Sequence, residues 1–334
     1  MKIGLYMATQ WREGADLGPE TANLVEQTRV AKANGFASVM VGQHLVSRPL
    51  QMFQAIPLLA RLSAESGDML IGPALVLLPL FNPVVVAEES ATIDWFCGGN
   101  YVLAVGLGYR KEEFASMNIP YGERVPRLTE SVEVIRKLWR DDEVHHKGRF
   151  FTLDGVRASH KPKQAGGPPI WIGGDVEAAV KRAATLGDGW IISPMVSYED
   201  ARKHLATFRA TRQAAGLPAA KSYPMIRECH VGSGRGKALD EVREPLLFKY
   251  QAYASWGQND TGSVPADSLA RDFDRFAADR FLIGDEAQVL DGIERYRALG
   301  VDHILLRPQW PGWSHQETVK CLERVGRVIG RLRG

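Results

Sequence analysis

Apolar residues in this 334-residue chain fall into short continuous runs separated by stretches with helical spacing. The runs show little alternation of apolar and polar positions, which is typical of parallel strands covered on both faces. We expect strands over residues 2–7, 69–75, 101–105, 170–172 and 225–231, and in the segments that end at Val41, Ile192 and Leu306. Helices are expected over residues 19–33, 49–64, 83–96, 125–139, 198–214, 285–299 and 315–332, with another beginning at Asp175.

Three joints in the chain share one pattern, in which a helix ends, a glycine follows, and a buried strand begins. The glycines are Gly35, Gly187 and Gly300. Glycine after a helix commonly takes the left-handed conformation that closes it, and a short link then puts the strand beside the helix. Recurrence of this joint predicts one domain over residues 1–334, built as an eight-stranded (βα)8 TIM barrel. A doubly wound open sheet is the alternative.

Three segments do not fit the minimal strand-and-helix repeat. They are residues 107–122, 142–168 and 255–278, and the second contains a Lys147-Gly148 turn typical of a hairpin. In a barrel, long loops at the carboxyl ends of the strands shape a substrate site or act as lids, although such loops can equally be disordered. We expect these three insertions at that face.

The composition favours a globular protein and excludes several classes of function. The net charge is +2 with both signs spread along the chain, so nucleic acid is not an expected partner. Three distant cysteines in no paired motif indicate neither a disulfide framework nor a zinc site. Prolines and an asparagine interrupt the apolar stretch 69–87, which predicts a strand, a loop and a helix start instead of a membrane span. A cytoplasmic protein fits these features.

A short strand, two glycines and a helix start follow one another after Pro169. Gly173 and Gly174 can bring backbone N–H groups close to a ligand, and Asp175 stands where a helix can begin. A helix N-terminus offers unpaired N–H donors and a partial positive charge, which suits a phosphate. The same residues also fit a helix that Asp175 simply caps, with glycines that serve the turn.

Two other positions at strand ends carry candidate chemistry. His44 follows the second strand, where a barrel side chain faces the ligand mouth and could move a proton near neutral pH; a solvated loop histidine is the alternative. Gly106-Leu-Gly108-Tyr109 follows the fourth strand but lacks the third glycine of a dinucleotide fingerprint. The adjacent His145-His146 have no further ligand at metal spacing, so we interpret them as surface residues and expect no metal.

Several blocks of the sequence resemble the bacterial-luciferase-like flavin-dependent oxidoreductases. The resemblance covers nearly the whole chain except about residues 232–278. It rests on residues 77–94, 102–109, 112–114, 122–139, 162–164 running on to 188–190, 280–285 and 299–307. Members of this family are (βα)8 barrels, which agrees with the fold expected from the repeat.

The resemblance implies a role for each candidate site residue. Gly173, Gly174 and the backbone of Asp175 would hold the phosphate of a reduced flavin. A non-prolyl cis peptide near Ala74-Leu75 would support one face of the flavin ring, and His44 would lie near its reactive edge. Beside the ring we expect Gly106, Gly108 and Tyr109, and on the substrate side Gln10, Trp11 and Arg307.

The resemblance therefore implies a flavin-dependent monooxygenase that uses reduced FMN and O2 to oxygenate a small organic substrate. A separate flavin reductase would supply the reduced flavin, and a homodimer is the expected assembly. Two alternatives share the pattern: an oxidoreductase that transfers hydride with the deazaflavin F420, and a flavin-binding protein without turnover. One departure is Cys97-Gly-Gly-Asn100, where the family commonly has Ser-Gly-Gly-Arg, which bears on how Asp94 is paired.

Overall fold

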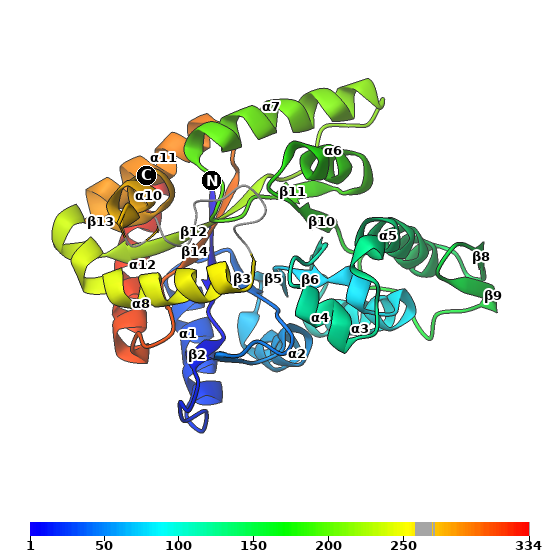
Figure 1. Ribbon diagram of the computed structural model, residues 1–334, viewed down its shortest axis with the longest axis horizontal. Helices are drawn as coiled ribbons and strands as arrows, with labels where there is room; N and C mark the ends of the chain where they lie inside the picture. The colour runs from blue at the N-terminus through cyan, green and yellow to red at the C-terminus, as the bar shows by residue number, and fades with distance from the viewer. Residues whose placement is uncertain (258–268, 270, 334) are drawn as a thin grey trace.

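The computed structural model describes residues 1–257, 269 and 271–333, and it has an α/β fold in which helices surround parallel strands (Figure 1). The parallel strands are β1 (Lys2–Met7), β3 (Ser38–Val41), β5 (Leu70–Pro73), β6 (Val76–Leu77), β7 (Leu103–Gly106), β10 (Ile170–Gly173), β11 (Gly189–Ile191), β12 (Pro224–Val231), β13 (Leu282–Gly284) and β14 (His303–Arg307). Short antiparallel pairs are formed by β2 (Gln10–Arg12) with β4 (Leu50–Met52) and by β8 (Val144–Lys147) with β9 (Thr152–Val156).

The helices cover the outside of the strands. They are α1 (Glu20–Ala33), α2 (Ala55–Ser66), α3 (Pro83–Phe96), α4 (Lys111–Ser116), α5 (Arg124–Arg140), α6 (Glu177–Leu186), α7 (Tyr198–Ala214), α8 (Arg235–Ser255), α10 (Phe273–Arg280), α11 (Glu286–Ala298) and α12 (His315–Arg333), with short 3-10 turns η1 (Leu78–Leu80) and η2 (Tyr121–Glu123). Most strands are buried along their whole length, as their continuous apolar sequences indicate.

The strands pair in two sheets, β13-β12-β14-β1-β3-β5 and β11-β10-β7-β6. Parallel bridges join the two sheets on both sides: Ile71 with Tyr101 between β5 and β7, and Ile192 with Met225 between β11 and β12. The order of the strands thus follows the order expected for the eight-stranded repeat.

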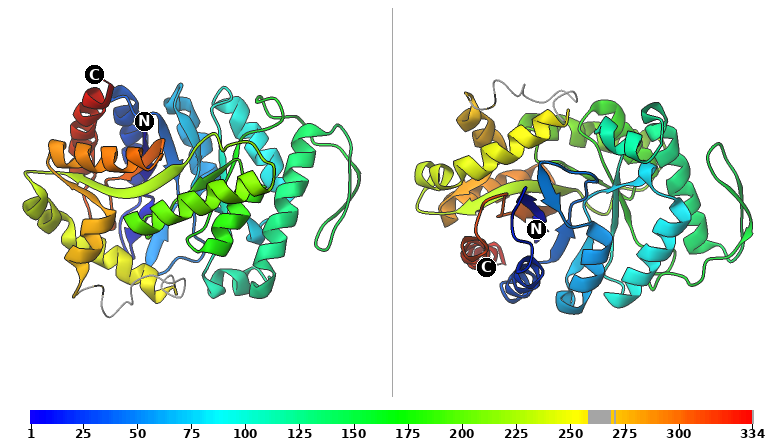
Figure 2. Two further views of the ribbon diagram at one scale, coloured as in Figure 1. Left: turned by 90° about the horizontal axis from the view of Figure 1, so that it is seen from above. Right: turned by 60° about the horizontal axis from the view of Figure 1, so that its bottom comes forward.

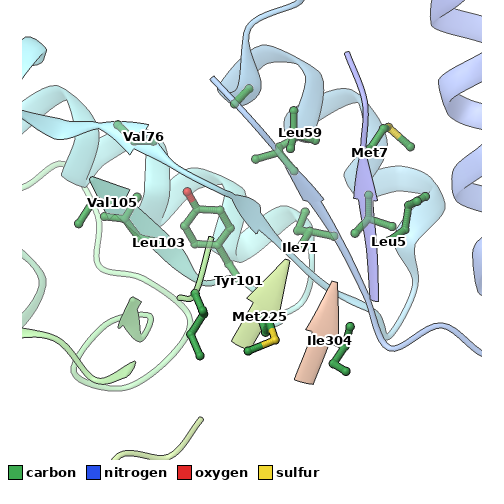
Figure 3. Packing of buried hydrophobic residues seen from close by; sticks show 14 of the residues in the cluster. Leu5, Met7, Leu59, Ile71, Val76, Tyr101, Leu103, Val105, Met225 and Ile304 are labelled. Carbon is green, nitrogen blue, oxygen red and sulfur yellow. The ribbon is translucent and has the colours of Figure 1, made fainter. Parts of the chain in front are cut away.

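A small inner cluster of side chains lies between the strands. Eight of its residues come one each from eight parallel strands: Tyr6, Met40, Leu70, Ala104, Trp171, Ile191, Ile226 and Leu305. A second and much larger cluster lies between the strands and the outer helices, where Leu5 and Ile71 of the strands point toward residues such as Leu59 of α2 (Figure 3). Side chains therefore fill both sides of the strand layer, which makes the strand ends the natural place for a site.

The three expected insertions have different outcomes. Residues 107–122 form α4 and η2, and residues 142–168 form the β8–β9 hairpin, which projects away from the rest of the molecule (Figure 2). The Lys147-Gly148 turn does lie in that hairpin. The third segment, 255–278, falls largely outside the described residues, although α10 occupies its end.

Several sequence expectations about helices were wrong in detail. Gly35 and Gly300 have φ angles of 78° and 92°, as expected for left-handed helix ends, but Gly187 has a φ of −97°. Glycine is required there because a Cβ would lie 3.0 Å from the carbonyl oxygens of Ala183 and Gly189. The helix expected over 49–64 begins only at Ala55, because Leu50–Met52 pairs as a strand. The long helix α8 was not predicted.

A buried histidine makes the stability of the fold dependent on pH. His303, at the start of β14, is buried against Ser38, whose Oγ lies 2.8 Å from its Nε2. Burial lowers the pKa of His303 to about 3 from 6.5. Below pH 6.5 the unfolded chain therefore takes up a proton that the folded chain does not, and the free energy of unfolding falls as the pH falls.

We expect this group alone to remove about 2 kcal/mol of stability between pH 6.5 and 5, because each unit of pKa difference corresponds to about 1.4 kcal/mol. Urea denaturation of the wild type and of His303→Gln at both pH values measures the difference. The variant should lose less stability over this range. Equal losses in the two proteins would show that His303 is not the group responsible.

Candidate functional site

A cavity of about 440 Å³ opens at the carboxyl ends of the parallel strands. Eleven of the twelve site residues expected from the sequence line it. They are Gln10, His44, Ala74, Leu75, Gly106, Gly108, Tyr109, Gly173, Gly174, Asp175 and Arg307. Residues far apart in the sequence are brought together because parallel strands end at the same face. Residues that bind one ligand must surround one cavity, and these eleven residues do. The role of each residue is a proposal.

Trp11 is the exception among the residues expected on the substrate side. Its side chain is buried, packs against Phe53 with ring centroids 4.8 Å apart, and does not line the cavity. The reason is the short β2–β4 pair, in which neighbouring side chains point to opposite faces. Gln10 therefore faces the cavity while Trp11 faces the core.

The two glycines after β10 form a close-fitting wall at one end of the cavity. A Cβ at Gly173 would lie 2.5 Å from Cδ1 of Leu75, and a Cβ at Gly174 would overlap the side chain of Ala179. Helix α6 begins three residues later at Glu177, so its first N–H groups have no partners within the helix. We name Gly173, Gly174, Asp175 and Val176 the glycine cradle.

Asp175 does not cap α6, which corrects one of the two interpretations of this segment. Val176 is the N-cap residue and makes no side-chain cap bond. The Asp175 carboxyl is buried; its Oδ2 accepts a hydrogen bond of 2.8 Å from Ser193, and its Oδ1 has no partner among the described residues. Burial raises the pKa of Asp175, against the opposing effect of the Ser193 hydrogen bond. In its protonated form Oδ1 can donate a hydrogen bond to a ligand in the cradle.

The peptide bond between Ala74 and Leu75 is cis, at the position where the resemblance implied one. The Ala74 carbonyl accepts a hydrogen bond of 2.9 Å from the Tyr6 hydroxyl. The Leu75 side chain packs against Gly106 and Gly173, since a Cβ at Gly106 would lie 2.7 Å from its Cδ1. These contacts produce an apolar shelf in the middle of the cavity.

His44 is held at the cavity by a buried carboxylate. Its Nδ1 lies 3.0 Å from Oε1 of Glu113, on the inserted helix α4, and the same oxygen accepts a hydrogen bond of 2.9 Å from the backbone N–H of Leu45. The Glu113 side chain is fully buried. Because Nδ1 is taken by Glu113, Nε2 is the nitrogen of His44 available to a ligand.

Aromatic rings enclose His44. The rings of Tyr109, Tyr253 and Trp256 have centroids 5.6, 5.8 and 5.3 Å from its own. The Tyr109 hydroxyl is buried without a partner among the described residues, and burial raises its pKa well above the usual value. The hydroxyl of Tyr109 is therefore neutral and can form a hydrogen bond with a ligand in the cavity. The aromatic rings around it keep water away.

Arg307 is the last residue of β14 and also lines the cavity. Its Nε and Nη2 donate to the two carboxylate oxygens of Glu228 at 3.0 and 2.7 Å. The guanidinium also stacks 4.6 Å from the ring centroid of Tyr6. The Tyr253 hydroxyl donates to Oε1 of Gln10 at 3.0 Å, which fixes both side chains at the same end.

Sequence reasoning missed four residues of this site. Glu113 belonged to a quoted block but received no role, and Tyr253 lies on the unpredicted helix α8. Arg124 and Ser193 also line the cavity, beside the glycine cradle. Ser193 lies two residues after the end of β11, so the strand-end rule that singled out His44 would have found it as well.

Outside this site, the structure bears on the other expectations. Within residues 1–257, 269 and 271–333 there is no group of three potential metal ligands. His145 is exposed as expected, but His146 is buried and its Nε2 lies 3.2 Å from Glu130, so the surface interpretation of His146 was wrong. Asp94 is paired by Gln164, through a backbone and a side-chain hydrogen bond of 2.8 and 2.7 Å. Among the described helices, none is both long and apolar enough to span a bilayer.

Comparisons with known proteins agree with this geometry. A family model described as luciferase-like monooxygenase matches residues 1–303. An F420-dependent glucose-6-phosphate dehydrogenase of Mycolicibacterium fortuitum is 34% identical over 296 residues, covering 84% of this chain and 86% of that protein. The oxygenase component of a flavin-dependent trigonelline monooxygenase of Acinetobacter baylyi is 21% identical over 317 residues, covering 90% and 87%. The crystal structure of monooxygenase RslO1 from Streptomyces bottropensis superimposes with a TM-score of 0.88 at 21% identity, covering 100% of both chains.

Proposed function

Because the chain belongs to the luciferase-like monooxygenase family and is an enzyme of that oxidoreductase class, we propose that it binds reduced FMN and uses O2 to oxygenate a small organic substrate. The observation that carries this proposal is the cavity itself, which combines the glycine cradle at a helix N-terminus, an apolar shelf and a histidine enclosed by aromatic rings. Two of the proteins compared above are monooxygenases, which supports the same reaction class.

The residues present fit a flavin. Side chains at positions 173 and 174 would clash with Leu75 and Ala179, so only glycine fits there, and the cradle lines the cavity with bare backbone, which suits a phosphate at a helix N-terminus. Arg124 lines the cavity near this point and adds positive charge, as a terminal phosphate requires. Tyr109 and Asp175 each keep a buried polar atom without a partner among the described residues, ready for hydrogen bonds to a ligand.

The reduced flavin, when bound, supplies the chemistry that activates O2, and the residues of this chain do the rest. The cradle holds the phosphate, and the shelf formed by Ala74 and Leu75 supports the ring. His44 holds or moves a proton at Nε2, while Glu113 fixes its tautomer through Nδ1. The aromatic rings around His44 exclude water from the reacting atoms.

Hydride transfer with F420 is the second candidate, and one observation favours it. The pair of His44 with the buried Glu113 is suited to accept the proton of an alcohol while hydride leaves for a cofactor. The F420-dependent relative of Mycolicibacterium fortuitum supports this reading.

Further parts of the proposal concern the molecule as a whole. We take the eight strands that surround the inner cluster to close as a (βα)8 barrel, in one domain over residues 1–334. A separate flavin reductase would deliver reduced FMN, and the protein would act as a homodimer.

One experiment separates the two cofactors. The purified protein is titrated anaerobically with reduced FMN and with F420, and each complex is then mixed with O2 while oxygen consumption is recorded. Our proposal predicts micromolar affinity for reduced FMN and oxygen consumption that depends on substrate. Binding of F420 without affinity for reduced FMN would instead establish the hydride-transfer reaction.

His44→Ala should lower turnover at least 100-fold, because general acid–base catalysis contributes about 10²–10⁴ in rate. The affinity for the cofactor should stay within a few-fold of the wild type, since the phosphate binds elsewhere. His145→Ala, at an exposed histidine, is the matched control and should leave turnover unchanged. Turnover of His44→Ala equal to that of the wild type would remove the catalytic assignment.

A further inference from the structure

The buried carboxylate of Glu228, which does not itself line the cavity, contacts two cationic side chains but carries only one negative charge. The Glu228 side chain is fully buried and accepts hydrogen bonds from Arg307, from the Nζ of Lys249, from the Tyr250 hydroxyl at 2.8 Å and from the indole N–H of Trp310. Burial opposes ionisation of Glu228, but the charges of Arg307 and Lys249 nevertheless hold its pKa at about 2. Glu228 is therefore an anion at neutral pH.

The charges of this cluster do not cancel. Glu228 contributes one negative charge, whereas Arg307 and Lys249 each contribute a positive one when protonated, and both cations are buried. Below about pH 7, the value to which burial lowers the pKa of Lys249, the lysine is protonated, and one unit of positive charge is then left for a group outside the cluster.

Only Arg307 among these five residues lines the cavity. Its hydrogen bonds to Glu228 use Nε and Nη2, and the Tyr253 hydroxyl lies close to the same guanidinium, so Nη1 is the nitrogen that a ligand can reach beside Tyr253. The guanidinium is held in place by Glu228 on one side and by the Tyr6 ring on another. An arginine fixed in this way is organised in advance to bind a carboxylate.

The walls next to Arg307 are apolar and aromatic. The cavity that Arg307 lines is also lined by Tyr6, Tyr253, Met52 and Ile226, and the Tyr253 hydroxyl donates a hydrogen bond to Gln10. Such walls suit a flat, largely apolar molecule, whose single charged group can reach the guanidinium.

We propose that the substrate of the oxidoreductase is a small aromatic acid whose carboxylate binds Nη1 of Arg307. The oxidation chemistry rests on the function proposed above, but recognition of the acid rests on the Glu228 cluster alone. In this arrangement the substrate anion completes the charge balance of the buried cluster, and its ring lies among the aromatic walls near His44.

Isothermal titration with benzoate and with its neutral isostere benzamide tests the proposal. The protein is saturated with FMN so that the glycine cradle is filled, and the titration is done at pH 6, below the pKa of Lys249, which burial lowers to about 7. We expect benzoate to bind the wild type at least ten-fold more tightly than benzamide. In Arg307→Met this preference should disappear, while FMN affinity should change less than three-fold.

Two further variants locate the effect. Lys249→Met leaves Arg307 in place but removes the excess charge, so the preference for benzoate should fall several-fold. Arg202→Gln removes an exposed arginine of α7 that does not line the cavity, and it is the matched control, which should keep the full preference. Lys249→Met also keeps the test valid should Arg307→Met fail to fold.

Equal affinity of the wild type for benzoate and benzamide overturns the proposal, as does a preference for benzoate that survives both Arg307→Met and Lys249→Met. A preference lost equally in Arg202→Gln also overturns it, because the effect would then not be specific to the arginine that lines the cavity. If reduced FMN does not bind in the anaerobic titration, the function proposed above fails, whereas absence of binding by oxidised FMN alone does not bear on it; the same titrations of the flavin-free protein still decide whether Arg307 selects the acid.

Discussion

Gly174→Asp should lower the affinity for reduced FMN at least 100-fold. The new side chain would overlap Ala179 at the start of α6, and its carboxylate would stand in the glycine cradle beside the buried Asp175. The negative charge of the new carboxylate would repel the phosphate, and the displaced helix start would no longer present its N–H groups. Anaerobic titration of wild type and variant with reduced FMN measures the effect.

Gly330→Ala is the matched control for this change. Gly330 lies in α12 with nothing near the position of an added Cβ, so alanine should fold normally and bind flavin like the wild type. Unchanged flavin affinity in Gly174→Asp, with a normal circular dichroism spectrum, would remove the cradle from the cofactor site.

Glu228→Leu should lower the free energy of unfolding by about 3–5 kcal/mol, because it leaves two buried cations without their counter-ion. Arg307 and Lys249 both pair with this carboxylate, and neither side chain is more than 4% exposed. The measurement is urea denaturation monitored by tryptophan fluorescence at pH 6, where Lys249 is protonated.

Glu244→Leu provides the comparison at an exposed ion pair. Glu244 pairs with Arg12 at 2.6 Å, but its side chain is 71% exposed, and such pairs contribute about 0–1 kcal/mol. The two variants should therefore differ by several kcal/mol. A loss in Glu228→Leu as small as that in Glu244→Leu would mean that the buried cluster does not hold α8 and β14 together.

Much of the fold could be predicted from the sequence because its signals are local. Continuous apolar runs located the strands, and Gly35 and Gly300 adopt the left-handed conformation that ends a helix. Gly187 also stands between a helix and a strand, but for another reason: backbone carbonyl oxygens lie close to the position that a Cβ would take. That contact depends on how the chain folds. Helix α8 was missed since its polar and apolar positions show no strong helical face, and Pro245 lies inside it.

The site was predicted in outline but not in its charge chemistry. Strand ends brought His44, Gly174 and Arg307 to one cavity, as the barrel rule indicates. The partners of these residues come from elsewhere: Glu113, which binds His44, from an inserted helix, and Glu228, which binds Arg307, from β12. Such pairings join residues 69 and 79 positions apart, as in His44 with Glu113 and Arg307 with Glu228, so spacing in the sequence gives no sign of them.

The most direct test of the account is a crystal structure of the protein prepared anaerobically with reduced FMN. We predict that the flavin phosphate accepts hydrogen bonds from the backbone N–H groups of the glycine cradle. The flavin ring should rest on Ala74 and Leu75 with His44 at its edge, and Arg307 should remain free for a carboxylate. A phosphate bound elsewhere, or a cavity without flavin at saturating concentration, would contradict the account.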